Sequence, residues 1–72
     1  MKLTYYSDTD SLYIDLSSHQ SAESREASPG VVLDYDADGA LVGIDIDNAS
    51  KKLDLQDLSV EHLPSFKQRV TV

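Results

Sequence analysis

The amino-acid sequence predicts a mainly β fold: an antiparallel meander of about five strands, one short helix after residue 47, and a C-terminal segment that could add a strand. Apolar side chains recur at every second position in residues 3–16 and 31–46, which is the periodicity of half-buried strands. Turn-forming residues interrupt both stretches, so each predicts a hairpin. Short connections favour pairing of sequential strands, which gives a meander.

Residues 3–16 predict the first hairpin, around a four-residue loop at 7–10. This loop sets apolar side chains opposite apolar side chains on one face of the hairpin. The predicted pairs are Leu3 with Ile14 and Tyr5 with Leu12.

Residues 17–30 are polar. We expect a turn at residues 17–20, followed by a polar strand over roughly residues 22–27 that suits the edge of a sheet. Pro29-Gly30 then turns the chain into the second hairpin.

Residues 31–46 form the stronger hairpin, and their apolar positions indicate its register. A two-residue loop at Asp38-Gly39 brings both apolar sets to one face, and a four-residue loop from Asp36 to Gly39 keeps the same parity. A three-residue loop would send the isoleucines to the opposite face, so the pattern argues against it. The predicted pairs are Tyr35 with Val42, Leu33 with Ile44 and Val31 with Ile46.

The alternation of apolar and polar residues ends after Asp47. Asn48 is a competent N-cap for one or two helical turns over residues 49–53. Residues 54–58 are ambiguous between helix and strand, whereas residues 59–63 predict a short strand that Pro64 ends. We therefore expect one domain over residues 1–64. Residues 65–72 are then either an edge strand or a free, partner-binding tail.

The 72 residues include 13 acidic and 6 basic side chains, for a formal net charge of -7. An acidic surface repels phosphate backbones, so nucleic-acid binding by the chain alone is disfavoured and a basic protein partner is favoured. The chain has no cysteine and no apolar run of membrane-spanning length, so we expect a cytoplasmic protein without disulfides. A core this small has a thin margin of stability, which favours a homo-oligomer.

An acidic stripe is the main candidate interaction site. The predicted register places its four aspartates on the outer face of the sheet, where like charges cost stability unless a cation or a basic partner covers them. A second, overlapping set of four aspartates fits much of a calcium-loop pattern. Calcium loops of that kind lie between helices, whereas this segment lies between predicted strands. The stripe consists of Asp34, Asp36, Asp45 and Asp47, and the candidate metal ligands are Asp34, Asp36, Asp38 and Asp45.

Aromatic and apolar side chains supply further interaction candidates. Tyr6 and Tyr13 face outward near each other across the first hairpin, where they form either an interface patch or a cross-strand pair. Phe66 and Val70 lie beside basic residues in the tail and could contact a partner. The two histidines belong to no catalytic or metal motif, and the sequence indicates no catalytic residue and no cofactor.

Four segments carry a family resemblance: YYSDTDSLYIDL at residues 5–16, AES at 22–24, PGVVLDYDADGALVGIDI at 29–46 and NASKKLDL at 48–55. Together they resemble the bacterial domain-of-unknown-function family numbered twenty-two eighty-three. That family has no established activity, so the resemblance assigns no catalytic or binding residue. Some members are similar to small antitoxin-like partners encoded beside predicted ribonuclease toxins, which implies a toxin-like basic partner.

These observations predict a non-enzymatic protein-interaction module, with antitoxin-like binding of a basic partner as its most concrete form. One alternative is a β-hairpin protein that binds a divalent cation weakly through the aspartates. A second alternative is a minimal enzyme that uses carboxylates in a cleft between subunits, although the sequence holds no motif for it.

Overall fold

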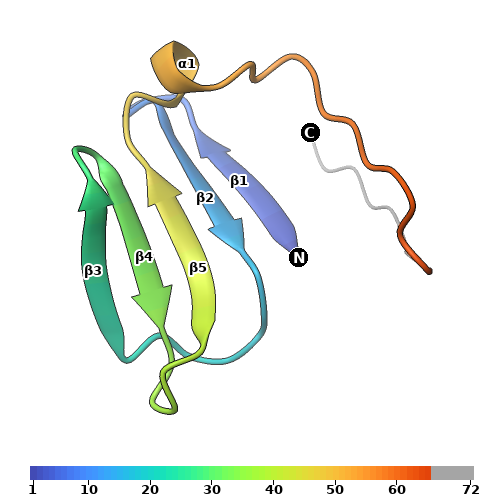
Figure 1. Ribbon diagram of the computed structural model, residues 1–72. Coiled ribbons are helices and arrows are strands. Elements are labelled where there is room, and N and C mark those ends of the chain that lie inside the picture. Colours follow the sequence, from blue (N-terminus) through green and yellow to red (C-terminus); the bar gives the residue numbers. More distant parts are fainter. Residues whose placement is uncertain (66–72) are drawn as a thin grey trace.

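A computed structural model describes residues 1–65, which form one five-stranded antiparallel sheet with a short helix at one end (Figure 1). The fold class is mainly β, as the sequence predicts, and the helix follows residue 47. The elements are β1 (Lys2–Tyr6), β2 (Ser11–Asp15), β3 (Glu23–Ser28), β4 (Val31–Tyr35), β5 (Leu41–Ile46) and α1 (Ala49–Lys52).

The order of the strands differs from the predicted meander. It is β1-β2-β5-β4-β3, so β2 pairs with β5, and β3 lies at the far edge. The connection between β2 and β3 passes along the end of the sheet to reach that edge (Figure 1). This order brings apolar strands together, since Leu12 pairs with Ile46 and Ile14 with Ile44. It also leaves the polar β3 where only one side needs pairing, giving strands β2 to β5 a Greek-key order.

The β1–β2 hairpin has the predicted loop and the predicted pairs. In the β4–β5 hairpin, Leu33 pairs with Ile44 and Val31 with Ile46, again as predicted. The predicted pair of Tyr35 with Val42 is wrong, because Tyr35 lies opposite Leu41 and the register shifts there.

The loop of the β4–β5 hairpin explains that shift. The Asp36 N–H donates to the Ala40 carbonyl over 2.9 Å, the Gly39 N–H donates to the Asp36 carbonyl over 3.1 Å, and Gly39 has a φ of 85°. This is a three-residue loop with glycine in the left-handed conformation, the length that the apolar pattern argued against. Val42 is the extra residue of a β-bulge, which restores the parity of the isoleucines that follow.

Helix α1 begins after Asn48, but the Asn48 side chain makes no capping hydrogen bond and its backbone is left-handed, with a φ of 52°. Asp10 supplies the cap instead. Its carboxylate accepts the Ser50 N–H over 3.1 Å and the Ser50 hydroxyl over 2.6 Å, and its carbonyl accepts the Ala49 N–H over 2.8 Å. A four-residue helix has little stability of its own, so these contacts to the β1–β2 loop hold it in place.

The segment after α1 does not form the strand predicted for residues 59–63. A strand needs backbone hydrogen bonds to a neighbouring strand, and this segment runs out beyond β1 without pairing with its free edge (Figure 1). The Asp54 side chain starts that course by accepting the Gln56 N–H over 3.1 Å in a local turn. The predicted tail strand, including Phe66 and Val70, lies outside the described residues.

The buried core is small. Its buried hydrophobic residues are Leu12, Val42 and Ala49, and no large side chain of the described residues is fully buried. The sheet therefore forms a single layer whose apolar face is only partly covered. Within residues 1–65, no helix has the length and apolar character that crossing a membrane requires.

Candidate interaction site

One face of the sheet carries nearly all of its apolar side chains, because paired residues of antiparallel strands point to the same side. Most of these side chains are half-buried, and in β1 Leu3 and Tyr5 are 45% and 46% exposed. The apolar face includes Leu3, Tyr5, Leu12, Ile14, Val31, Leu33, Tyr35, Leu41, Ile44 and Ile46.

A groove of about 660 Å³ lies at the β1 end of the apolar face. The segment after α1 forms its other wall, where Leu58 is 73% exposed. The groove is lined by Leu3, Tyr5, Leu12, Leu53, Asp54, Leu55, Asp57 and Leu58. Its mostly apolar lining suits the side chains of another protein segment.

The opposite, polar face holds a compact hydrogen-bonded set. The Tyr13 hydroxyl donates to Asp34 Oδ2 over 2.6 Å, and the Ser24 hydroxyl donates to Asp34 Oδ1 over 2.6 Å. The Tyr13 ring lies against Gly43, where a Cβ atom would overlap the tyrosine hydroxyl. The bond to Asp34, helped by burial, raises the pKa of Tyr13 to about 12. Asp34 is thus already engaged by two donors.

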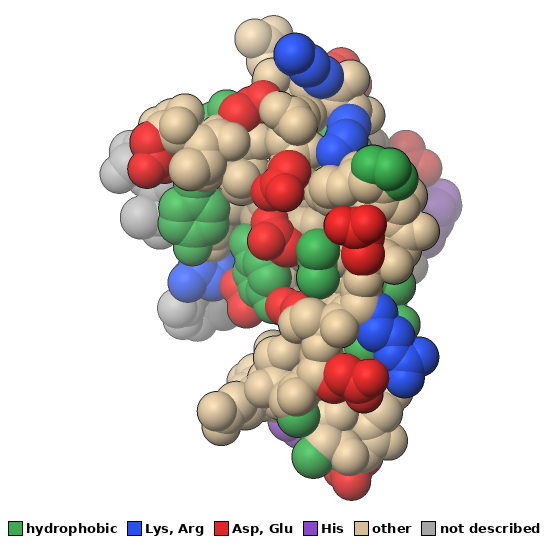
Figure 2. Space-filling model, turned by 90° about the vertical axis from the view of Figure 1, so that its left-hand side faces the viewer, with side chains coloured by type: hydrophobic (Ala, Val, Ile, Leu, Met, Phe, Trp, Pro, Cys, Tyr) green, Lys and Arg blue, Asp and Glu red, His purple; other side chains and the backbone are tan. Residues whose placement is uncertain are grey.

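Asp45 and Asp47 lie close to Asp34 on the polar face. Burial raises the pKa of Asp45 above its ordinary value, and the negative charges of Asp47 and Asp34 raise it further. The Asp47 carboxylate accepts a long hydrogen bond from the Ser11 hydroxyl over 3.3 Å, and the Asp47 backbone carbonyl accepts one from Lys52 Nζ over 2.6 Å. Figure 2, seen from the β3 side of the sheet, shows several acidic side chains close together in the middle of the view. Three of the four predicted stripe residues therefore form an acidic cluster.

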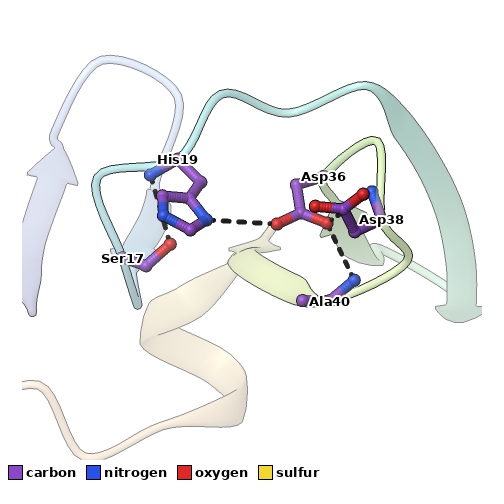
Figure 3. Close-up of polar contacts among 5 residues, drawn as sticks. All are labelled: Ser17, His19, Asp36, Asp38 and Ala40. Atoms are coloured by element: carbon purple, nitrogen blue, oxygen red, sulfur yellow. Dashed lines mark hydrogen bonds and ion pairs between the residues drawn. The ribbon is translucent and has the colours of Figure 1, made fainter.

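Asp36, the fourth residue of the predicted stripe, points away into the hairpin loop (Figure 3). Its carboxylate accepts the N–H groups of Asp38 and Ala40, both over 2.9 Å, and contacts His19 Nδ1 at 3.2 Å. These donors, the Ala40 N–H first among them, lower the pKa of Asp36. The Asp36 side chain is only 9% exposed. Its contact with His19 ties the β2–β3 connection to the hairpin tip.

The four candidate metal ligands do not come together. Asp36 is occupied by the loop, Asp34 by Tyr13 and Ser24, and the Asp38 side chain is exposed on the loop. Among the described residues, no group of three or more histidines and carboxylates could hold a metal ion. Tyr6 and Tyr13 lie on the polar face at diagonal positions of the β1–β2 pair, since Thr4 pairs with Tyr13 and Tyr6 with Ser11; Tyr6 is 51% exposed, and Tyr13 is bonded to Asp34.

Sequence reasoning missed Ser24 and Gly43 as parts of the polar face. A glycine inside a strand pattern often marks the close approach of another group, and Gly43 marks the position of the Tyr13 ring. Ser24 gave no such signal, because its contact with Asp34 depends on β3 lying beside β4.

A family model described as a protein of unknown function, DUF2283, matches residues 2–50. The chain belongs to the DUF2283 family. The DUF2283 match includes all five strands and the start of α1, so both faces of the sheet lie within it. The outer wall of the groove, residues 53–58, lies beyond the match. No curated protein and no solved structure matches the chain.

Proposed function

We propose that this DUF2283 protein is a protein-interaction module that binds a partner protein across the apolar face of its sheet. The open apolar face carries this proposal, since Leu3 and Tyr5 are nearly half exposed beside a groove of about 660 Å³. Covering one large apolar side chain contributes on the order of 1–3 kcal/mol. A partner that covers several of them would therefore stabilise the domain as well as bind to it. The proposed role is binding without a chemical reaction.

The acidic cluster supports a narrower form of the proposal, in which the partner is basic and the module neutralises it in the manner of a cytoplasmic antitoxin. The whole chain has a net charge of -7, and burial together with the negative charges of Asp47 and Asp34 raises the pKa of Asp45. A basic partner that extends from the apolar face around an edge of the sheet could place a cationic side chain beside Asp45 and remove the repulsion from Asp34 and Asp47. Charge complementarity of this kind speeds association and selects among partners.

A pair of matched variants on β4 tests the proposal. Leu33 lies on the apolar face and the adjacent Val32 on the polar face, and both are half-buried. We expect tagged wild-type chain to retain a specific protein from extracts of its native host, identified by mass spectrometry. Leu33→Thr should reduce retention at least tenfold, and Val32→Thr should leave it nearly unchanged, with circular dichroism showing that both variants fold.

Three results would count against the proposal or its narrower form. Equal retention by wild type and Leu33→Thr would show that the apolar face is not the binding surface. Retention of no protein would contradict the interaction role itself. A retained partner that is acidic, or whose binding to the purified chain does not weaken as salt increases, would contradict the basic-partner form.

A further inference from the structure

The two edges of the sheet differ in their protection against pairing with another strand. At one edge, all residues of β3 are exposed and three of them are charged: Glu23, Arg25 and Glu26. At the other edge, β1 has one charged residue, Lys2, and no carboxylate. Exposed edge strands usually carry charges that discourage edge-to-edge pairing. In an acidic chain, β1 is the strand that a second copy could approach with the least repulsion.

The sequence of β1 is complementary to itself when two copies run antiparallel about Thr4. In this register Thr4 lies opposite Thr4 of the second copy, and Leu3 lies opposite Tyr5 of the second copy on the apolar face. Lys2 lies opposite Tyr6 of the second copy on the other face, where an ammonium group and an aromatic ring attract each other. Every cross-strand pair is thus favourable, and the two apolar faces join on the same side.

We propose that two copies of this chain pair through their β1 edges in this register, and that the segment after α1 of each copy lies over the apolar face of the other. The inference adds a second copy as a partner and uses the sheet edge, so it goes beyond the function proposed above. The paired strands would form one continuous ten-stranded sheet, since each copy contributes five strands.

The segment after α1 supports the second half of the proposal. It leaves the sheet on the β1 side and runs beyond β1, away from β2 (Figure 1). Within the described residues it joins no strand, yet Leu58, Val60 and Leu63 are 73%, 48% and 53% exposed. A run of seven extended residues spans roughly 23 Å, which is longer than the distance across two neighbouring strands that lie about 4.8 Å apart. In the dimer this segment could therefore cross β1 and β2 of the second copy.

A stable dimer needs more buried area than the β1 edge supplies, so both the paired β1 strands and the segment after α1 must contribute to the interface. Stable interfaces bury about 800 Å² on each partner. Two five-residue strands that meet edge to edge fall short of that area, and the apolar segment after α1 supplies further contact. The acidic cluster lies on β4, β5 and the residue after β5, away from β1, so the like charges of the two copies stay apart.

Charge exchange at residue 4 tests the register, using size-exclusion chromatography with light scattering on the full chain. Wild type should be a dimer. Thr4→Glu and Thr4→Lys should each be monomeric, because identical charges would lie directly opposite each other. An equal mixture of the two variants should form a dimer again, because the opposed charges would then attract. Ser21→Glu and Ser21→Lys make the same charge changes at an exposed residue outside the strands and should remain dimeric.

Each other outcome would overturn the inference. A wild-type chain that is monomeric at millimolar concentration excludes the dimer. Persistence of the dimer in both residue 4 variants, or failure of the mixture to associate, excludes this register. Loss of the dimer in the Ser21 variants would assign the effect to net charge. Circular dichroism checks that each variant folds. These measurements use the purified chain alone, so a negative result would rule out the dimer without bearing on the proposed binding of a partner protein.

A second variant tests the exchanged segment by itself. Replacing Leu58 and Val60 together by serine leaves β1 unchanged and should weaken the dimer about tenfold, which corresponds to about 1.4 kcal/mol. Dilution series of the two proteins measure this difference. An unchanged dissociation constant would show that the segment does not contact the second copy.

Discussion

On the polar face of the sheet, Tyr13, Ser24 and Asp34 form a closed hydrogen-bonded set against Gly43, whereas on the apolar face Leu3 and Tyr5 remain nearly half exposed. The polar face thus contributes to the stability of the isolated domain through contacts that need no other molecule. The apolar face has the side chains of a core without a second layer to cover them. This difference is the basis for the proposals that a partner or a second copy covers the apolar side of the sheet.

Crowding Gly43 should break the polar face and have the largest effect. In Gly43→Ala the new methyl group would displace the Tyr13 ring and cost about 2–3 kcal/mol through strain and the lost bond to Asp34. Urea denaturation measures the change. Gly39→Ala is the matched control, since Gly39 has a φ of 85° but no atom within 4 Å of the added methyl group, and it should cost about 1 kcal/mol. Equal losses would show that the approach of Tyr13 to Gly43 is unimportant.

Removing the Tyr13 hydroxyl should sharpen the comparison with a smaller effect. Tyr13→Phe leaves the ring in place but deletes the bond to Asp34, and should cost about 1–2 kcal/mol at pH 7. In the folded wild type the pKa of Tyr13 is raised to about 12, above the ordinary tyrosine value of about 10. Its contribution is therefore complete below pH 10 and is lost as pH rises toward 12.

The Tyr13→Phe variant should show a weaker loss of stability across that alkaline range. Some loss should remain, because the hydrogen bond to Asp10 also raises the pKa of Tyr5. Denaturation curves at a series of pH values, with tyrosinate absorbance as the titration signal, measure both effects. Identical alkaline limbs for wild type and variant would contradict the role given to Tyr13.

Neutralising Asp45 should stabilise the domain slightly while weakening its binding of a basic partner. Asp45 has a raised pKa, so its ionisation opposes folding, and Asp45→Asn should add a few tenths to about 1 kcal/mol at pH 7. This gain should disappear as pH falls through the pKa of Asp45, because the wild-type carboxyl is then also neutral. Thermal unfolding and binding titrations measure the two effects. Destabilisation at neutral pH would contradict the view that burial and the neighbouring carboxylates oppose the ionisation of Asp45.

The hairpins show how much of this fold local sequence can predict. Alternating apolar residues and turn-forming segments predicted both hairpins, the one-sided apolar face and the apolar pairs of both hairpins outside the β4–β5 turn, where the pairs predicted for Tyr35 with Val42 and Ala37 with Ala40 are wrong. These features depend on residues close together in the chain. The error at Tyr35 arose because the three-residue loop shifts the strand register by one residue and the bulge at Val42 shifts it back. The alternation of apolar residues after the bulge is therefore the same as it would be without either shift.

Parts of the candidate site could be predicted in the same way, and parts could not. Asp34, Asp45 and Asp47 gather as the alternation predicts, since they lie on one hairpin and the residue that follows it. Asp36 does not join them, because its carboxylate accepts hydrogen bonds from N–H groups of the loop, which the alternation of the strand does not predict. The groove depends on where the segment after α1 lies, which its ambiguous spacing left open.

The sequence by itself determined the four strands of the two hairpins, the segments in which those hairpins turn and which face is apolar, because periodicity and turn chemistry act over a few residues. Tertiary structure alone decided that β5 lies beside β2, that Asp10 caps a helix 40 residues away and that Tyr13 reaches Asp34. Each of these contacts joins distant parts of the chain, and its free energy depends on the competing arrangements of the whole sheet rather than on any local pattern.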